Sequence, residues 1–214
     1  MTDVWTARAQ AYRVSDAHAQ GEDLDQVVAW AAGARTALDV ATGGGHVARR
    51  LREVGVEVVT CDPSPGMEPD VICRAEDLPF ADASFDVVTC RTAQHHFADV
   101  QGAVTEMARV SRDRVLLVDT VFRGDDVERA EKLRDPSHVR NYSEMEWASF
   151  AERAGLRVEE TKIFEHTFDL GAWLSRTGCE GEEAAEVVAL LGERVRDGRL
   201  TLDKIAIKAV KPRR

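Results

Sequence analysis

Short apolar runs alternate with helical patterns over the first two thirds of the chain. Apolar side chains recur at helical spacing over 22–33, which predicts a helix that ends at Gly33. Runs of apolar and β-branched residues predict strands at 37–41, 56–61, 71–73, 85–90 and 115–118. A further helix is expected over 46–55, and another over 100–108 with Asp99 placed to cap it.

Strands that alternate with helices and are apolar on both faces are typical of a parallel sheet with right-handed crossovers. The last third is less regular, with a helical stretch at 125–133, a capping box formed by Ser143 and Glu146, and later elements at 156–164, 182–194 and 200–210. We predict an α/β, doubly wound, Rossmann-like fold with a mostly parallel seven-stranded sheet, helices on both faces and a small helical cap. We find no repeat, linker or boundary, so we expect a single domain over 1–214.

Composition narrows the classes of partner. Of the 214 residues, 44% are hydrophobic and 31% charged, which is enough apolar material for a packed core. The net charge of −10 disfavours nucleic acid as a partner. The sequence has neither an 18-residue apolar run nor a signal-like start, and we interpret its four widely spaced cysteines as reduced core thiols. We therefore expect a cytoplasmic protein that does not insert into a membrane.

A glycine cluster at 43–45 joins the first strand to the next helix, where ligands of parallel sheets bind. Gly43, Gly45 and Ala48 also satisfy a dinucleotide-binding pattern, so the cluster does not identify the ligand. Asp39, inside an apolar strand, needs hydrogen bonds from a cationic ligand group or from the turn itself. Asp62, at the end of the second strand, is placed to hold a ribose or, alternatively, to cap the segment after it.

Three segments in order resemble the class I S-adenosylmethionine-dependent methyltransferases, in particular the branch that includes ubiquinone and menaquinone biosynthesis C-methyltransferases. They are LDVATGGGHVA, VVTCDPSPGM and RAEDLPFADASFDVVTCRTAQHHF. The segments AYRVSDAHAQGEDL and EKLRDPSHVRNYSEMEW resemble the additions of one subgroup. The resemblance covers about 12–210 and implies S-adenosyl-L-methionine as cofactor, with S-adenosyl-L-homocysteine as product.

The resemblance also implies roles for individual residues. The amino-acid end of the cofactor would lie among Asp39, Ala41, Gly43 and Gly45, and the ribose would be held by Asp62. The residues expected around the adenine are Pro63, Met67, Ala75 and Glu76, and those expected beside the sulfonium are Thr89–Arg91.

Three positions depart from the family pattern. Ala41 stands where many relatives have glycine, and Arg74 occupies a place often filled by an acidic residue that contacts adenine. The segment SRDR at 111–114 replaces the usual proline and glycine turn before the fifth strand.

The histidines that follow the fourth strand are the candidates for accepting a proton during the reaction. His95 and His96 are the candidate catalytic residues, with His96 preferred, because a neutral imidazole accepts a proton near neutral pH. An equally weighted alternative is that both only pack around the pocket. They lack a set of cysteines or carboxylates at ligand spacing, so we predict no metal.

A lid over the cofactor is expected from residues 1–34, with Tyr12 and His18 contacting the cofactor. Two cap segments, 123–150 and 167–197, are expected over the acceptor pocket, and Trp147, Phe150, Phe168 and Trp173 are candidates either for that pocket or for the core. The expected partner is a small, partly apolar acceptor, and the chain is expected to be a monomer or homodimer. The alternatives are an NAD(P)-dependent oxidoreductase and a non-catalytic binding protein of the methyltransferase fold.

Overall fold

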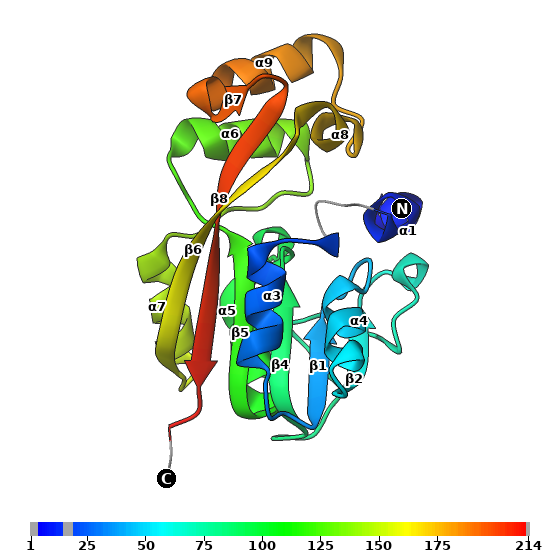
Figure 1. The fold of residues 1–214 in the computed structure, drawn as a ribbon, viewed down its shortest axis with the longest axis vertical. Helices are drawn as coiled ribbons and strands as arrows, with labels where there is room; N and C mark the ends of the chain where they lie inside the picture. The colour runs from blue at the N-terminus through cyan, green and yellow to red at the C-terminus, as the bar shows by residue number, and fades with distance from the viewer. Residues whose placement is uncertain (1–3, 15–18, 213–214) are drawn as a thin grey trace.

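A computed structural model describes residues 4–14 and 19–212 of the chain. Its strands form one sheet, in the order β3-β2-β1-β4-β5-β8-β6, and the short β7 pairs with β8 (Figure 1). The strands are β1 (Thr36–Val40), β2 (Glu57–Asp62), β3 (Val71–Ile72), β4 (Phe85–Arg91), β5 (Ser111–Thr120), β6 (Arg157–Asp169), β7 (Val195–Arg196) and β8 (Arg199–Val210).

The sheet is parallel from β3 to β5, while β8 and β6 run antiparallel to their neighbours. This confirms the predicted doubly wound, mostly parallel α/β architecture. The path has the seven strands that were predicted, and the two-residue β7 adds an eighth.

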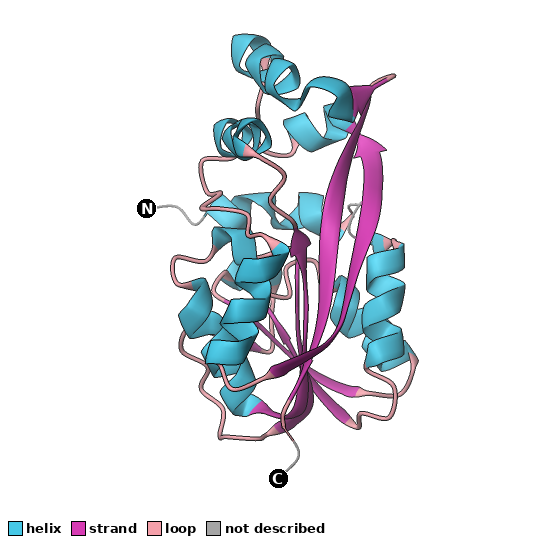
Figure 2. Ribbon diagram, turned by 90° about the vertical axis from the view of Figure 1, so that its left-hand side faces the viewer, coloured by secondary structure: helices cyan, strands magenta, loops and turns pink. Residues whose placement is uncertain are grey.

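Helices cover both faces of the sheet, as Figure 2 shows with the sheet seen near its edge. One apolar core lies under α3 (Glu22–Trp30) and α4 (His46–Glu53), and the other under α5 (Val100–Val110) and α7 (Glu144–Arg153). Neighbouring strand residues enter opposite cores because side chains alternate along a strand: Ala37 belongs to the first and Leu38 to the second. Both faces are therefore apolar, which explains the continuous apolar runs in the sequence.

A helical cap stands beyond one end of the sheet and has its own apolar core. Strands β6 and β8 run on past the sheet into this cap, which contains α6 (Asp125–Arg134), α8 (Leu170–Ser175) and α9 (Gly181–Leu191), followed by the 3-10 turn η3 (Gly192–Arg194). Trp147 and Phe150 belong to the core under α7, whereas Trp173 belongs to the core of the cap. The structure thus places 144–150 outside the cap, because the helix that contains them packs on α5 and β6.

Two further sequence predictions need correction. SRDR at 111–114 is the start of β5 and not a turn, because the chain passes directly from α5 into a strand that pairs with β4. The strand expected at 156–164 extends to Asp169, because its pairing with β8 continues to Arg199. The amino-terminal helix α1 (Val4–Arg13) carries little apolar periodicity and was not predicted in detail.

The predicted capping box at the start of α7 is present. Ser143 Oγ accepts a hydrogen bond from the backbone N–H of Glu146, and the carboxylate of Glu146 accepts from the backbone N–H of Ser143. These two hydrogen bonds satisfy backbone N–H groups at the start of α7.

Replacing the N-cap residue Ser143 tests how much the capping box contributes to stability. Ser143→Ala leaves the backbone N–H of Glu146 without this acceptor and should lower the free energy of unfolding by about 1 kcal/mol. For a chain of this length that corresponds to a fall of roughly 2–4 °C in Tm, measured by thermal denaturation. Ser143→Thr, which keeps the hydroxyl, should retain most of the stability. An unchanged Tm for Ser143→Ala would show that the capping box does not stabilise α7.

Candidate active site

A cavity of about 360 Å³ lies at the carboxyl ends of the central parallel strands. Its walls come from α1 and from the loops after β1, β2, β3 and β4. Strand β1 pairs with β2 on one side and β4 on the other, so the chain order reverses at this point of the sheet. In open parallel sheets this is where ligands bind.

The loop after β1 approaches α1 so closely that it has no room for a side chain at Gly44. Gly43 and Gly45 have positive φ values of 51° and 72°, which glycine adopts without strain. A Cβ at Gly44 would lie 2.8 Å from the backbone oxygen of Tyr12. Ala41 also has a positive φ, of 52°, a backbone conformation that glycine adopts with less strain than alanine.

Helix α1 is tied to this loop and to the loop after β2. The carbonyl oxygen of Tyr12 lies 2.9 Å from Nε2 of His46, and Arg13 donates to the carbonyl oxygen of Gly66 at 2.7 Å. Thr6 and Ser64 pair through their hydroxyls at 3.0 Å. Helix α1 therefore forms one wall of the cavity, to which it contributes Trp5 and Tyr12.

Asp39 is a buried carboxylate at the floor of the cavity. Its two oxygens accept hydrogen bonds from the hydroxyls of Thr42, at 2.6 Å, and Thr89, at 2.8 Å. Burial raises the pKa of Asp39 to about 6 despite these hydrogen bonds, because desolvation disfavours the charged form. The predicted link to the glycine turn is present through Thr42, and the position of Asp39 leaves it available to a cationic ligand group as well.

Asp62 lies at the end of β2 and joins two loops. One carboxylate oxygen accepts from the backbone N–H of Gly43 at 3.0 Å, and the other accepts from that of Ser64 at 2.9 Å. The second bond fixes the backbone of Ser64, the residue before η1 (Pro65–Met67), but no side chain caps the 3-10 turn itself. Each carboxylate oxygen can accept more than one hydrogen bond, so these two backbone donors do not by themselves exclude a ligand hydroxyl.

Arg91, at the end of β4, is neutralised by a buried ion pair. Its Nε lies 2.7 Å from Asp23 of α3, and Nζ of Lys204 lies 3.3 Å from the same carboxylate oxygen. Burial opposes ionisation of Asp23, but the two cations outweigh it and hold its pKa well below the usual range. Burial and the neighbouring Arg91 lower the pKa of Lys204 to about 8.

His95 is oriented by a buried carboxylate. It lies in the 3-10 turn η2 (Gln94–His96), which is anchored by the fully buried Gln94. Nδ1 of His95 lies 2.6 Å from Asp119 at the end of β5, and the same carboxylate accepts from the backbone N–H of His95 at 2.8 Å. Burial alone lowers the pKa of His95, but Asp119 outweighs it and the net pKa is raised. Donation by Nδ1 leaves Nε2 as the ring's proton acceptor.

His96 has a different environment. Its Nδ1 lies 3.0 Å from the carbonyl oxygen of Ser137, which can only accept, so Nδ1 carries the proton. Its ring packs edge-on against Trp5, with 4.6 Å between centroids. Burial, together with the neighbouring His95, lowers the pKa of His96. His96 is therefore neutral at physiological pH and a weak proton acceptor.

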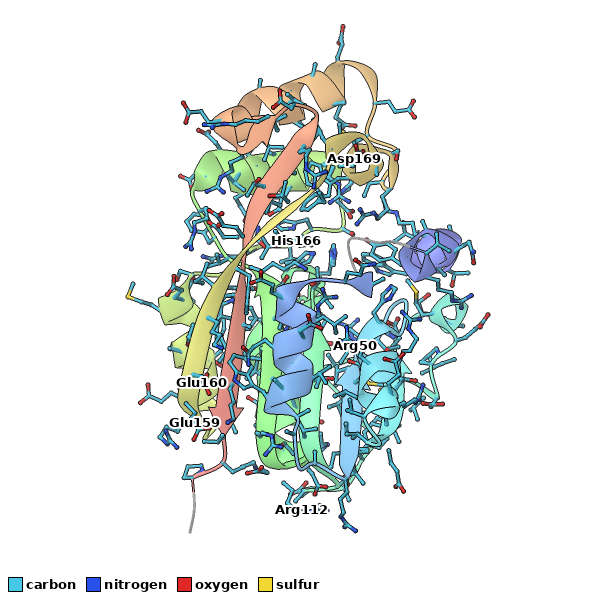
Figure 3. The ribbon with its side chains drawn as sticks, in the orientation of Figure 1. Arg50, Arg112, Glu159, Glu160, His166 and Asp169 are labelled. Carbon is cyan, nitrogen blue, oxygen red and sulfur yellow. The ribbon has the colours of Figure 1, made fainter. Side chains whose placement is uncertain are left out.

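A smaller cavity of about 60 Å³ adjoins the larger one. Tyr12, Thr92 and His96 line both cavities, and His95 lines only the smaller. Its remaining walls come from α6, from the cap ends of β6 and β8, and from α8 and the residue after it. Of the aromatic candidates, Phe168 and Trp173 line this cavity. His166, another wall residue, lies where β6 enters the cap (Figure 3).

Within the described residues, Glu128, Glu131 and His138 bring potential metal-ligand atoms within 4.8 Å of one another. Hydrogen bonds account for this grouping: Glu128 pairs with Nε2 of His138 at 3.1 Å, and Glu131 accepts from the side chain of Asn141. We assign no metal site to it.

The structure brings most of the predicted cofactor residues to one cavity. They are Tyr12, Asp39, Ala41, Gly43, Asp62, Pro63, Met67, Ala75, Glu76 and Arg91, and His96 lines the cavity with them. Gly45 does not line it, because it begins α4 as the N-cap residue. His18 lies outside the described residues. Arg74 lines the cavity with its exposed side chain paired to Glu76 at 3.2 Å.

Several residues of the site were missed at the sequence level. Trp5 has a detectable signal, since it lies seven residues before Tyr12 and therefore on the same helical face. Asp119 follows the rule that identified Asp62, an acidic residue at the carboxyl end of a parallel strand. Asp23 has no such signal, because its partners come from strands distant in sequence.

Comparison with known proteins agrees with this geometry. The family model described as a methyltransferase domain, Methyltransf_11, matches residues 38–118. The chain is 32% identical over 221 residues to the uncharacterized methyltransferase YcgJ of Bacillus subtilis strain 168, a match that covers 92% of this chain and 87% of that protein.

Two further relatives extend the comparison. The crystal structure of a candidate methyltransferase from Bacillus halodurans superimposes with a TM-score of 0.79 at 32% identity, and covers 90% of this chain and 100% of its own. The demethylmenaquinone methyltransferase of Beutenbergia cavernae is 39% identical over 95 residues, which are 40% of each protein. No helix in the described part of the chain is long and apolar enough to cross a membrane. The cavity lies where the strand order of the sheet reverses, and the two Bacillus proteins match 92% and 90% of the chain. The chain belongs to the class I S-adenosylmethionine-dependent methyltransferases.

Proposed function

We propose that this chain binds S-adenosyl-L-methionine in the larger cavity and transfers its methyl group to a small metabolite. The observation that carries the proposal is the arrangement of Asp39, the glycine loop and Asp62 along one cavity that continues into a second. S-adenosyl-L-methionine has an ammonium, a carboxylate and a ribose diol. Asp39 would accept from the ammonium, the glycine backbone next to the start of a helix would face the carboxylate, and Asp62 would accept from the ribose diol. The net charge of −10 favours a small acceptor over a nucleic acid.

The cavity also fits the remaining parts of the cofactor. Met67 and Pro63 offer apolar surfaces for a purine ring, and Ala75 and Glu76 line the same region. Arg91 would lie near the sulfonium, and its charge is partly offset by the buried carboxylate of Asp23, which it shares with Lys204. The wall formed by α1 would exclude water, and His18, with the rest of segment 1–34, is proposed to extend it.

Bound S-adenosyl-L-methionine supplies a methyl group on a sulfonium whose departure leaves a neutral thioether. The protein's contribution is position and proton transfer. His96 lies at the junction of the two cavities and shapes the passage between them. His95 lines the acceptor side, and Asp119 holds its Nδ1–H, so Nε2 is the proton acceptor that the contacts favour. The sequence favoured His96, whose lowered pKa makes it the weaker base of the two.

Of the two alternatives, an NAD(P)-dependent oxidoreductase has no counterpart among the relatives described above. A non-catalytic binding protein of the same fold would bind the cofactor without turnover. The His95–Asp119 pair argues against it, because a carboxylate that fixes an imidazole tautomer is a device of proton transfer.

Cofactor binding is tested by calorimetric titration with S-adenosyl-L-methionine, S-adenosyl-L-homocysteine and NADH. The two sulfur nucleosides should bind and NADH should not. Asp62→Ala should weaken binding of both about tenfold or more, because a charge-assisted hydrogen bond to the ribose is lost. Asp82→Ala, an exposed position outside the cavity, should bind as the native chain does. If Asp62→Ala lowers Tm but leaves affinity unchanged, Asp62 only fixes the turn.

Asp39 predicts a pH dependence of binding. With a pKa of about 6, its carboxyl group is half protonated at pH 6 and charged above it, and only the charged form attracts the ligand's ammonium. The affinity for S-adenosyl-L-homocysteine should therefore rise between pH 5 and pH 7, as measured by titration at several pH values. Asp39→Asn should bind more weakly and without this rise. A flat profile in the native chain, or an identical slope in the variant, would exclude this role.

The roles of His95 and His96 are distinguished by measuring how variants of each affect turnover. His95→Gln should slow turnover at least a hundredfold with little change in cofactor affinity, because the proton acceptor is lost. Asp119→Asn should lower the rate and move its acidic inflection to lower pH, because the carboxylate that raises the pKa of His95 is gone. His96→Gln should change the rate less. Once an acceptor is found, a His95→Gln variant with native turnover would show that no base acts there.

A further inference from the structure

The smaller cavity contains two cations without a carboxylate partner. Arg134 ends α6 and Arg176 follows α8, so both come from the cap. Among the residues that the structure describes, neither forms an ion pair, whereas Lys204 in the same cavity is paired with Asp23 at 3.3 Å. Burial lowers the pKa of both guanidinium groups, which remain charged because an arginine starts far above neutral pH.

Both guanidinium groups are held by aromatic rings. Cζ of Arg134 lies 4.2 Å from the ring centre of Trp173, and its Nε donates to the carbonyl oxygen of that residue at 3.2 Å. Cζ of Arg176 lies 5.9 Å from the ring centre of Tyr12. A stacked guanidinium keeps its N–H groups for a ligand in the plane of the group, in a fork that matches a carboxylate.

The charges around the cavity leave a positive excess. Asp135 is paired with Arg8 at 3.2 Å, and His95 is paired with Asp119. Glu131 accepts a hydrogen bond from Asn141 and is the remaining carboxylate of the wall. Arg134 and Arg176 therefore stand against one carboxylate of the wall, and Lys204 shares its carboxylate with Arg91, so the cavity keeps a positive excess that an anionic ligand group would offset.

At about 60 Å³ the cavity has room for the carboxylate end of a ligand, whose body would extend into the adjoining larger cavity. Phe168 and Trp173 line the cavity together with the two arginines, and His96 lines both this cavity and the larger one. We propose that this cavity binds the carboxylate of an aromatic or similarly apolar acceptor through Arg134 and Arg176. The proposal rests on the proposed function, since it concerns the molecule that accepts the methyl group. It specifies that this acceptor carries a carboxylate, whereas the sequence predicts only that the acceptor is small and partly apolar.

The test uses benzoate as the probe, with benzamide as its neutral isostere and phenyl phosphate as the dianion. Calorimetry or ligand-detected NMR with the full chain, in the presence of S-adenosyl-L-homocysteine, should show benzoate binding at least tenfold tighter than either comparison ligand. The double variant Arg134→Gln/Arg176→Gln should lose about tenfold or more of the benzoate affinity, because the charge-assisted hydrogen bonds are removed. Arg129→Gln, on the exposed face of the same helix α6, should bind benzoate as the native chain does.

Other outcomes contradict the proposal. Equal binding of benzoate and benzamide, no binding of benzoate, or native benzoate affinity in the double variant would overturn it. A preference for phenyl phosphate would replace the carboxylate by a phosphate. Melting curves check that each variant is folded. Two further titrations separate this proposal from the proposed function: S-adenosyl-L-homocysteine is titrated alone, and benzoate is titrated without it. If the native chain binds benzoate but not the nucleoside, the proposed function is wrong and the carboxylate site remains.

Discussion

The parallel alignment of β1 with β2, β4 and β5 is the constraint on which the site depends. Parallel strands end at the same edge of a sheet, so residues that lie 20 to 80 positions apart arrive together there. Asp62 ends β2, Arg91 ends β4, and Asp119 lies near the end of β5. Each enters the site from a different strand, and the apolar packing of both faces holds the strands in register. Loss of that register would scatter every polar group of the site.

The polar groups at this edge are buried, and each is held by a specific partner. Asp39 has two hydroxyls, Asp62 has two backbone amides, and Asp119 has an imidazole. Asp23, on α3, pairs with both Arg91 and Lys204. A buried charge is expensive unless it is paired, so these contacts fix side-chain positions as well as charge. Asp39 is the exception, because burial dominates over its hydroxyl partners and raises its pKa towards neutrality.

The cap is built by continuing the sheet. Strands β6 and β8 pair over most of their length and extend beyond the parallel part, so the cap core is carried on a rigid two-stranded ribbon. This ribbon brings Phe168 and Lys204 to the smaller cavity, while α6 and the end of α8 bring the two arginines. The helix α1 closes the other side through Trp5 and Tyr12. The acceptor side of the site is thus formed by segments from both ends of the chain.

The sequence by itself determined the architecture and most of the cofactor cavity. Alternating strands and helices have clear periodicities, and the glycine loop, Asp39 and Asp62 follow from the rule that ligands meet the carboxyl ends of parallel strands. It did not determine that SRDR forms a strand, because its polar residues give no strand signal until pairing with β4 provides one. Nor did it separate Trp147, which packs in the core, from Trp173, which lines a cavity, since both lie at helical apolar positions. The partner of His95, the neutralisation of Arg91 and the two arginines of the cap were decided only by tertiary structure, because such contacts join residues remote in the chain and depend on burial that no local pattern records.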